Sequence, residues 1–151
     1  MTVNAKILLI DDDKNIRQTL AIVLQEEGYI VDTAETGKEA VEKSFANFYN
    51  LAIVDWRLPD IEGTVLITQL KETTPKMAKI MLTGYPSMNN AIEAVNLHAD
   101  AFLIKPVDVE ELLKKIRDLL SLQNESKEFC ENQIVSFIET RTKQILQTDE
   151  H

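Results

Sequence analysis

Four short apolar runs constrain this chain most, because each one ends in residues suited to binding phosphate or a divalent cation. The runs end in Asp11-Asp12-Asp13, Asp55, Thr83-Gly84 and Lys105-Pro106. If the runs are parallel strands of one sheet, these side chains meet at its carboxyl edge, where open α/β sheets place their sites. The four endings together predict a magnesium-assisted phosphoryl site.

The alternation of apolar runs with helical patterns predicts the fold class. A fifth, shorter run at Tyr29-Ile30-Val31 has polar surroundings, which predicts an edge strand. Strands that alternate with helices form βαβ units, which build a parallel sheet covered by helices on both faces. Asp13 is a predicted helix N-cap, Thr36-Gly37-Lys38-Glu39 is a predicted capping box, and Gly28 is predicted to end the first helix. Pro86-Ser87 is predicted to open the fourth helix. We expect five strands and five helices of an α/β domain by about residue 121.

Composition excludes several classes of protein. The 151 residues carry a net charge of −9, which argues against nucleic-acid binding by this chain because phosphate backbones would be repelled. The single cysteine, Cys130, permits neither an internal disulfide nor a cysteine zinc cluster. No apolar stretch approaches the roughly 20 residues of a membrane span. Residues 1–6 lead directly into a strand and leave no room for a signal peptide, so a cytoplasmic location is the default expectation.

The last thirty residues differ in character from the rest. We expect one domain over residues 1–121 and a helical tail or linker over 122–151, without an identifiable effector domain. Residues 121–126 are polar and predict a joint, whereas residues 128–147 carry apolar side chains at helical intervals. Such a helix needs a surface to pack on. It could be a dimer helix, a helix docked on the domain, or the start of a linker.

The motifs closely resemble those of the receiver domains of two-component response regulators. The resemblance covers residues 6–121 and rests on four segments: Lys6–Asp13, Val54–Gly63, Thr83-Gly84 and Phe102–Pro106. It implies a flavodoxin-like (βα)5 fold with strand order 2-1-3-4-5. It also implies that Asp55 accepts a phosphoryl group from the phosphohistidine of a sensor kinase or phosphotransfer protein.

The acidic residues suit a metal site. A carboxylate is a competent nucleophile for phosphoryl transfer, but it repels phosphoryl oxygens unless a cation lies between them. Mg²⁺ suits this role, with Mn²⁺ as a possible substitute. The resemblance implies that Asp12 and Asp55 contact the metal, that Asp11 acts mainly through water, and that the main-chain carbonyl of Arg57 completes the set. Without metal, the clustered carboxylates should raise at least one pKa.

Five further residues have roles that the resemblance implies. Lys105 would stabilise charge during transfer and pair with Asp55 at rest, and the peptide bond from Lys105 to Pro106 would be cis. Thr83 would offer its hydroxyl to a phosphoryl oxygen; the alternative is a strand-end threonine bonded to backbone. Phe102 would be a switch aromatic that turns inward when Thr83 moves, and the alternative is a core phenylalanine. Arg57 and Tyr85 would flank the path by which water reaches the acyl phosphate, and we predict that they set the rate of its hydrolysis.

Three functions fit these features to different degrees. The first is a signalling switch, not an enzyme, whose output is a changed surface near residues 88–97 and 102–116, where a partner or a second copy binds. The second is a magnesium-dependent phosphatase of the haloacid-dehalogenase type, which is disfavoured. Its nucleophile ends the first strand in an Asp-x-Asp-x-Thr pattern, and here position 15 is Asn. The third is an inert pseudo-receiver docking module. This interpretation is less favoured because the reactive residues of the receiver motifs are all present.

Overall fold

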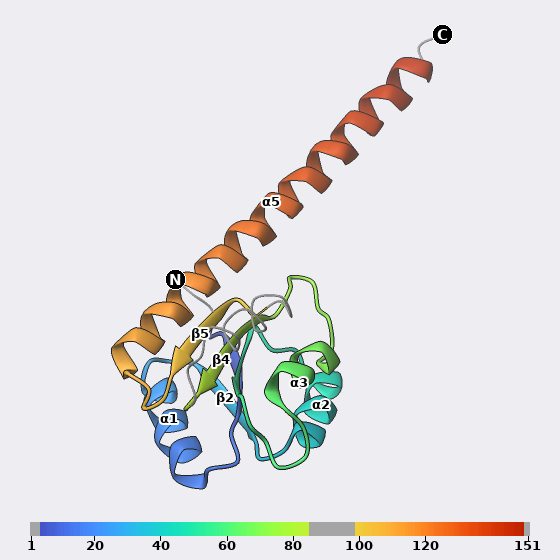
Figure 1. The fold of residues 1–151 in the computed structure, drawn as a ribbon. Helices are drawn as coiled ribbons and strands as arrows, with labels where there is room; N and C mark the ends of the chain where they lie inside the picture. Colours follow the sequence, from blue (N-terminus) through green and yellow to red (C-terminus); the bar gives the residue numbers. More distant parts are fainter. Residues whose placement is uncertain (1–3, 85–98, 150–151) are drawn as a thin grey trace.

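The structure, a computed structural model, describes residues 4–84 and 99–149, except for the side chains of residues 127–132, 144 and 146–149. Its centre is a five-stranded parallel sheet in the order β2-β1-β3-β4-β5, as predicted (Figure 1). The strands are β1 (Lys6–Ile10), β2 (Ile30–Ala34), β3 (Leu51–Asp55), β4 (Ala78–Thr83) and β5 (Ala101–Ile104). The predicted edge strand is β2, which pairs with β1 alone.

Helices cover both faces of the sheet and bury its apolar side chains. The helices are α1 (Lys14–Glu26), α2 (Gly37–Ala46), α3 (Gly63–Gln69) and α5 (Val109–Asp149). Along β1, Ile7 and Leu9 belong to the cluster with α1 and α5, whereas Leu8 and Ile10 belong to the cluster with α2 and α3. This alternation explains why β1 and β3 are continuously apolar. The expected fourth helix, beginning at Pro86-Ser87, lies outside the described residues.

The predicted helix ends are present, with one change in detail. The Asp13 carboxylate accepts hydrogen bonds from the backbone of the first turn of α1, and Gly28 follows that helix with a φ of 95°. The Thr36 hydroxyl accepts a bond of 3.1 Å from the Glu39 amide. The Glu39 carboxylate accepts a bond from the amide of Glu35 instead of Thr36. The expected capping box is therefore half formed: the Thr36 hydroxyl makes its bond, but the Glu39 carboxylate bonds the amide of Glu35, one residue before Thr36.

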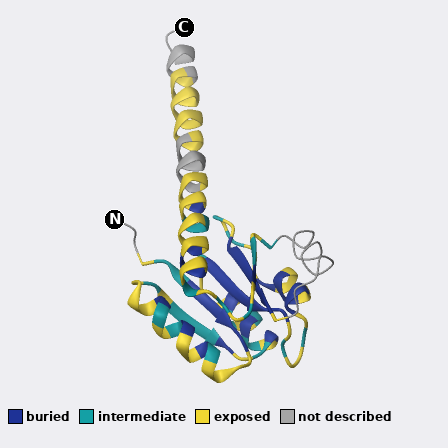
Figure 2. Cartoon of the chain, turned by 60° about the vertical axis from the view of Figure 1, so that its left-hand side comes forward, coloured by how far each residue is buried: buried dark blue, intermediate teal, exposed yellow. Residues whose placement is uncertain are grey.

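The last helix differs most from expectation, because α5 runs without a break through the expected joint at 121–126. Gln123 explains the difference: its side chain is buried and donates to the carbonyls of Asn50 and Lys76 at 2.9 and 2.8 Å. These bonds fix the helix to the chain just before β3 and β4. Beyond them α5 projects away from the domain (Figure 2). The apolar side chains of Ile134 and Ile138 on this part of the helix are exposed. No helix in the described part of the chain could span a membrane.

Candidate functional site

The register of the sheet brings the predicted polar residues to one edge. Val54 lies between Ile10 and Met81, so the residues that follow β1 and β3 are neighbours. Thr83, the last residue of β4, pairs with Ile104, the residue before Lys105. The Lys105 amide extends this pairing by donating to the Thr83 carbonyl at 2.7 Å. The carboxyl edge therefore carries the acidic residues, the threonine and the lysine together.

Three carboxylates form a compact cluster at this edge. One carboxylate oxygen each from Asp11, Asp12 and Asp55 lies within 4.8 Å of the others. Asp11 and Asp55 are buried, whereas Asp12 is exposed and gives the cluster a side open to solvent. Hard oxygen ligands with an open side fit Mg²⁺, which keeps several waters when bound to protein. The donor set therefore fits the expected ion.

Lys105 joins two of these carboxylates. Its Nζ lies 3.2 Å from Oδ1 of Asp55, as predicted for the resting site, and 3.0 Å from Oδ2 of Asp11, which was not predicted. Burial alone would lower the pKa of Lys105, but its contacts with Asp11 and Asp55 outweigh burial and raise that pKa. The ammonium therefore stays charged between two carboxylates. The bond from Lys105 to Pro106 is cis, as the family resemblance implied.

Among the described carboxylates, Asp55 has the largest shift in pKa. Burial and, to a smaller extent, the charge of Asp11 raise the pKa of Asp55, Lys105 opposes both effects, and the net result is a pKa of about 6. The expected repulsion between carboxylates is therefore present, but burial is the larger cause. Because the pKa lies below neutral pH, most Asp55 side chains are ionised at pH 7.5 and can act as nucleophiles.

The raised pKa of Asp55 predicts a pH-dependent cost in stability. A carboxyl group with a higher pKa in the folded state stabilises the fold when protonated, and this contribution is lost as pH rises from about 4 through about 6. We expect metal-free Asp55→Asn to be more stable than wild type by about 1–3 kcal/mol at pH 7.5, and the difference to shrink toward pH 4.5. Urea unfolding across this range tests it. An exposed control, Asp118→Asn, should show no such trend, and an equal gain in both variants would contradict the prediction.

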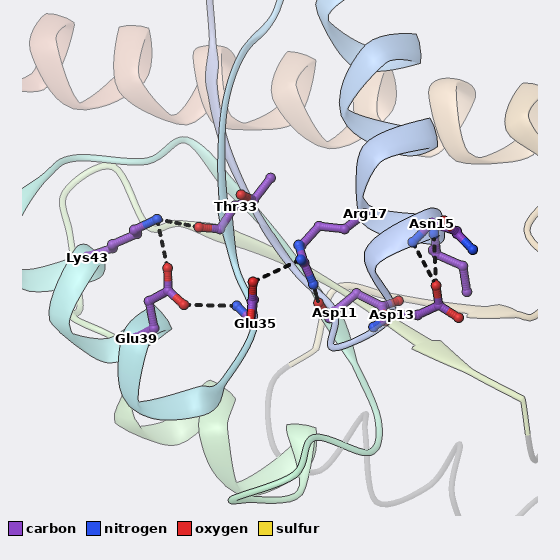
Figure 3. Close-up of polar contacts among 9 residues, drawn as sticks. Asp11, Asp13, Asn15, Arg17, Thr33, Glu35, Glu39 and Lys43 are labelled. Atoms are coloured by element: carbon purple, nitrogen blue, oxygen red, sulfur yellow. Dashed lines mark hydrogen bonds and ion pairs between the residues drawn. The ribbon is translucent and has the colours of Figure 1, made fainter.

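A polar network holds the loop that carries Asp11 (Figure 3). Arg17 is buried on α1 and donates to the Asp11 carbonyl at 2.8 Å and to the Glu35 carboxylate at 3.0 Å. The Glu35 amide in turn donates to Glu39, whose carboxylate pairs with Lys43. The network thus fixes the end of β1 relative to the end of β2. Sequence reasoning missed Arg17, although a charged residue at helical spacing from the buried Leu20 and Leu24 was a usable signal.

Two more residues support the edge and were missed. The amide of Gly63 donates to the Trp56 carbonyl at 2.6 Å, and this bond holds the start of α3 next to the residue that follows Asp55. The Asp60 carboxylate accepts bonds of 2.8 and 2.9 Å from the amides of Gly37 and Lys38. These bonds lower the pKa of Asp60 and tie the loop after β3 to the start of α2.

The remaining predicted residues are partly placed. Thr83 is fully buried at the end of β4. Phe102 is half-buried, and its ring meets Trp56 edge to face with centroids 6.0 Å apart. Arg57 is exposed two residues after Asp55. Tyr85 lies outside the described residues, as does most of the expected output surface at 88–97.

A parallel 2-1-3-4-5 sheet with a carboxylate cluster and a lysine at its carboxyl edge defines a CheY-like receiver of the flavodoxin fold. Comparison with known proteins agrees. The profile of the response regulator receiver domain matches residues 7–117, and the chain belongs to this family.

Individual relatives show the same match. The receiver domain protein (CheY-like) from Methanospirillum hungatei is 40% identical with a TM-score of 0.78, covering 82% of this chain and 99% of that one. Chemotaxis protein CheY4 of Vibrio cholerae is 32% identical with a TM-score of 0.69, covering 78% of this chain and 99% of its own. Response regulator ArlR of Staphylococcus saprophyticus is 34% identical over 120 residues, which are 78% of this chain and 53% of ArlR. The chain thus spans about half the length of that regulator.

Proposed function

We propose that this chain is a phosphorylation-dependent switch of a two-component phosphorelay, with Asp55 as the phosphoacceptor. The observation that carries the proposal is the position of the Asp55 carboxylate, 3.2 Å from the Lys105 ammonium and clustered with Asp11 and Asp12. The donor would be the phosphohistidine of a sensor kinase or phosphotransfer protein in the cytoplasm. Receiver domains of this kind are signalling phosphoacceptors rather than enzymes in the usual sense.

The transfer step assigns a role to each residue. An oxygen of Asp55 forms a bond to phosphorus as the P–N bond of the phosphohistidine breaks, and the bonding electrons remain on the imidazole, which takes up a proton. Lys105, which pairs with Asp55 at 3.2 Å, would move from Asp55 to a phosphoryl oxygen and stabilise the charge that develops there. Thr83 would donate its hydroxyl to a second oxygen. Asp11, Asp12, Asp55 and the carbonyl of Arg57 would hold Mg²⁺ or Mn²⁺, which when bound would neutralise the phosphoryl charge.

Two competing functions have less support. A phosphatase of the haloacid-dehalogenase type would place its nucleophile at the end of β1, where Asp11 is instead joined to Lys105. An inert docking module would not need the buried Asp55 carboxylate, whose raised pKa reflects a cost to folding. Both alternatives predict a chain that gains no stable phosphoryl group at Asp55.

We propose that the output is a changed surface around β5, the start of α5 and the preceding segment 88–97. A second copy of the chain could bind at this surface or along the projecting part of α5. Ile134, Phe137 and Ile138 are exposed there at spacings of three and four residues. Sedimentation equilibrium with and without acetyl phosphate separates the two sites, because only the first requires phosphorylation.

Trp56 should report occupancy of the site, because it follows Asp55 and contacts Phe102. We expect Mg²⁺ to change Trp56 emission in a saturable manner, and acetyl phosphate to change it further if Phe102 turns inward. Asp12→Asn should weaken the first change, and Phe102→Leu should reduce the second. A Phe102 rotamer that is identical with and without a phosphoryl mimic, as seen by NMR, would refute the switch role.

The lifetime of the acyl phosphate tests the roles proposed for Arg57 and Tyr85. Both side chains would lie near the path by which water reaches the phosphoryl group. We expect Arg57→Ala and Tyr85→Ala to change the hydrolysis rate by about tenfold, the scale of one modest polar interaction in a transition state. Decay of the phosphorylated mass measures it, with the exposed Lys38→Ala as control. Lifetimes equal to wild type in both variants would remove these roles.

A further inference from the structure

A hollow of about 450 Å³ lies at the amino edge of the sheet, at the opposite end of β4 from Thr83. The end of α3, the loop that follows it and the start of β4 form its walls. Its apolar lining is buried and consists of Ile67, Leu70 and Met77. Its charged lining contains the three lysines Lys71, Lys76 and Lys79, with one carboxylate, Glu72. The hollow is therefore an apolar surface bordered mainly by positive charge.

Lys79 is the unusual member of this lining, because it is only 7% exposed. In the described part of the chain, the partly buried lysines Lys6, Lys43 and Lys105 each pair with a carboxylate within 4.0 Å. No described carboxylate lies that close to the Lys79 ammonium. Asp100 accepts a bond of 2.8 Å from the backbone amide of Lys79 instead.

The environment of Lys79 disfavours its charge. Burial lowers the pKa of Lys79, and the positive charge of Lys76 lowers it further, against weaker opposing effects of Asp100 and Glu72. A buried ammonium without an ion-pair partner costs free energy unless an anion compensates it. The hollow that Lys79 lines is where such an anion can approach.

We propose that this hollow binds a small multivalent oxyanion, with Lys79 as its buried anchor and Lys71 and Lys76 as further contacts. The volume falls within the range of small-molecule sites, about 300–1,000 Å³. Phosphoryl and carboxylate groups both suit ammonium donors, and the apolar lining can accept the body of the ligand. The chain as a whole carries a net charge of −9 and repels anions, so binding depends on these local charges and weakens with salt. This site is independent of phosphorylation at Asp55.

The test is an NMR titration of the full metal-free chain with sodium pyrophosphate and, separately, with citrate, at constant ionic strength. We expect saturable shifts of the backbone amides of residues 67–79 with at least one of the two anions. A response to pyrophosphate alone assigns a phosphoryl ligand, and a response to citrate alone assigns a polycarboxylate. No saturable shift with either anion, or shifts centred on Asp11 and Lys105, would overturn the proposal.

Variants separate the site from general charge effects. Lys79→Met keeps the apolar stem of the side chain and should weaken binding at least tenfold, whereas the exposed Lys114→Met, with the same change in net charge, should leave it unchanged. Equal losses in both variants would overturn the proposal. If urea unfolding shows that Lys79→Met is not folded, the double variant Lys71→Met/Lys76→Met takes its place, with the same expected loss of anion binding. Phosphorylation of Asp55 in these variants should match wild type, so failure of one site is distinguishable from failure of the other.

Discussion

Lys105→Met should slow phosphorylation of Asp55 by acetyl phosphate by about 10²–10³-fold, the cost of removing one preorganised donor that stabilises developing charge. The Lys105 ammonium lies 3.2 Å from the Asp55 carboxylate. In the proposed mechanism it contacts a phosphoryl oxygen during transfer. Methionine keeps the length and the apolar stem of the side chain while removing the charge. The initial rate of appearance of the phosphorylated mass measures the effect.

The pH dependence of Lys105→Met separates two causes of this loss. Lys105 also lowers the pKa of Asp55, so the variant has fewer ionised Asp55 side chains at neutral pH. A loss due to protonation of Asp55 would disappear at pH 9, whereas a loss of charge stabilisation would persist there. We expect most of the loss to persist. Lys38→Met, an exposed lysine on α2, is the matched control. A variant rate within threefold of wild type at every pH would contradict the assigned role.

Gly63→Ala should destabilise the domain by about 3 kcal/mol or more, the upper range for overpacking at a rigid contact. A Cβ at this position would overlap the carbonyl oxygen of Asp55 and lie 2.9 Å from Cε of Met81. The methionine can move, but the Asp55 carbonyl belongs to the backbone at the end of β3. Alanine is favoured over glycine within a helix by about 1 kcal/mol, so helix propensity alone predicts that Gly63→Ala stabilises the domain. The expected loss of stability is the opposite result and therefore reports the overlap.

Gly84→Ala is the matched control for this variant, because a Cβ there meets no described atom within 4 Å. Urea unfolding of both variants, with the midpoint and slope compared, measures the difference. Gly63→Ala should also accept phosphate more slowly than wild type, since relief of the overlap displaces Asp55. Equal stability of Gly63→Ala and wild type would mean that α3 can shift away from β3 without cost.

Local patterns in the chain predict the parallel sheet and the meeting of Asp55, Thr83 and Lys105 at its carboxyl edge, whereas the strand order was implied by the family resemblance. Apolar runs define the strands, and the residue after each run falls at the same edge of a parallel sheet. The acidic cluster and its expected repulsion follow from the same reasoning.

The features that the sequence does not reveal depend on contacts between distant residues. Asp60 caps α2 from another loop, and Gly63 is needed because of a carbonyl across the turn from it. The polar stretch at 121–126 has the composition of a joint, but Gln123 finds its partners more than forty residues away, at Asn50 and Lys76. Arg17 lies between these two cases. The sequence pattern places it on the buried face of α1, but the acceptors of its hydrogen bonds come from residues that the pattern does not identify.

The intact mass of the chain after incubation with acetyl phosphate and Mg²⁺ tests the central claim most directly. We expect one added phosphoryl group in wild type and none in Asp55→Asn or after removal of the metal by a chelator. Thermal unfolding of the same samples establishes that each is folded. An unmodified wild-type mass in the folded protein, or the same adduct in Asp55→Asn, would contradict the assignment of Asp55 as the phosphoacceptor.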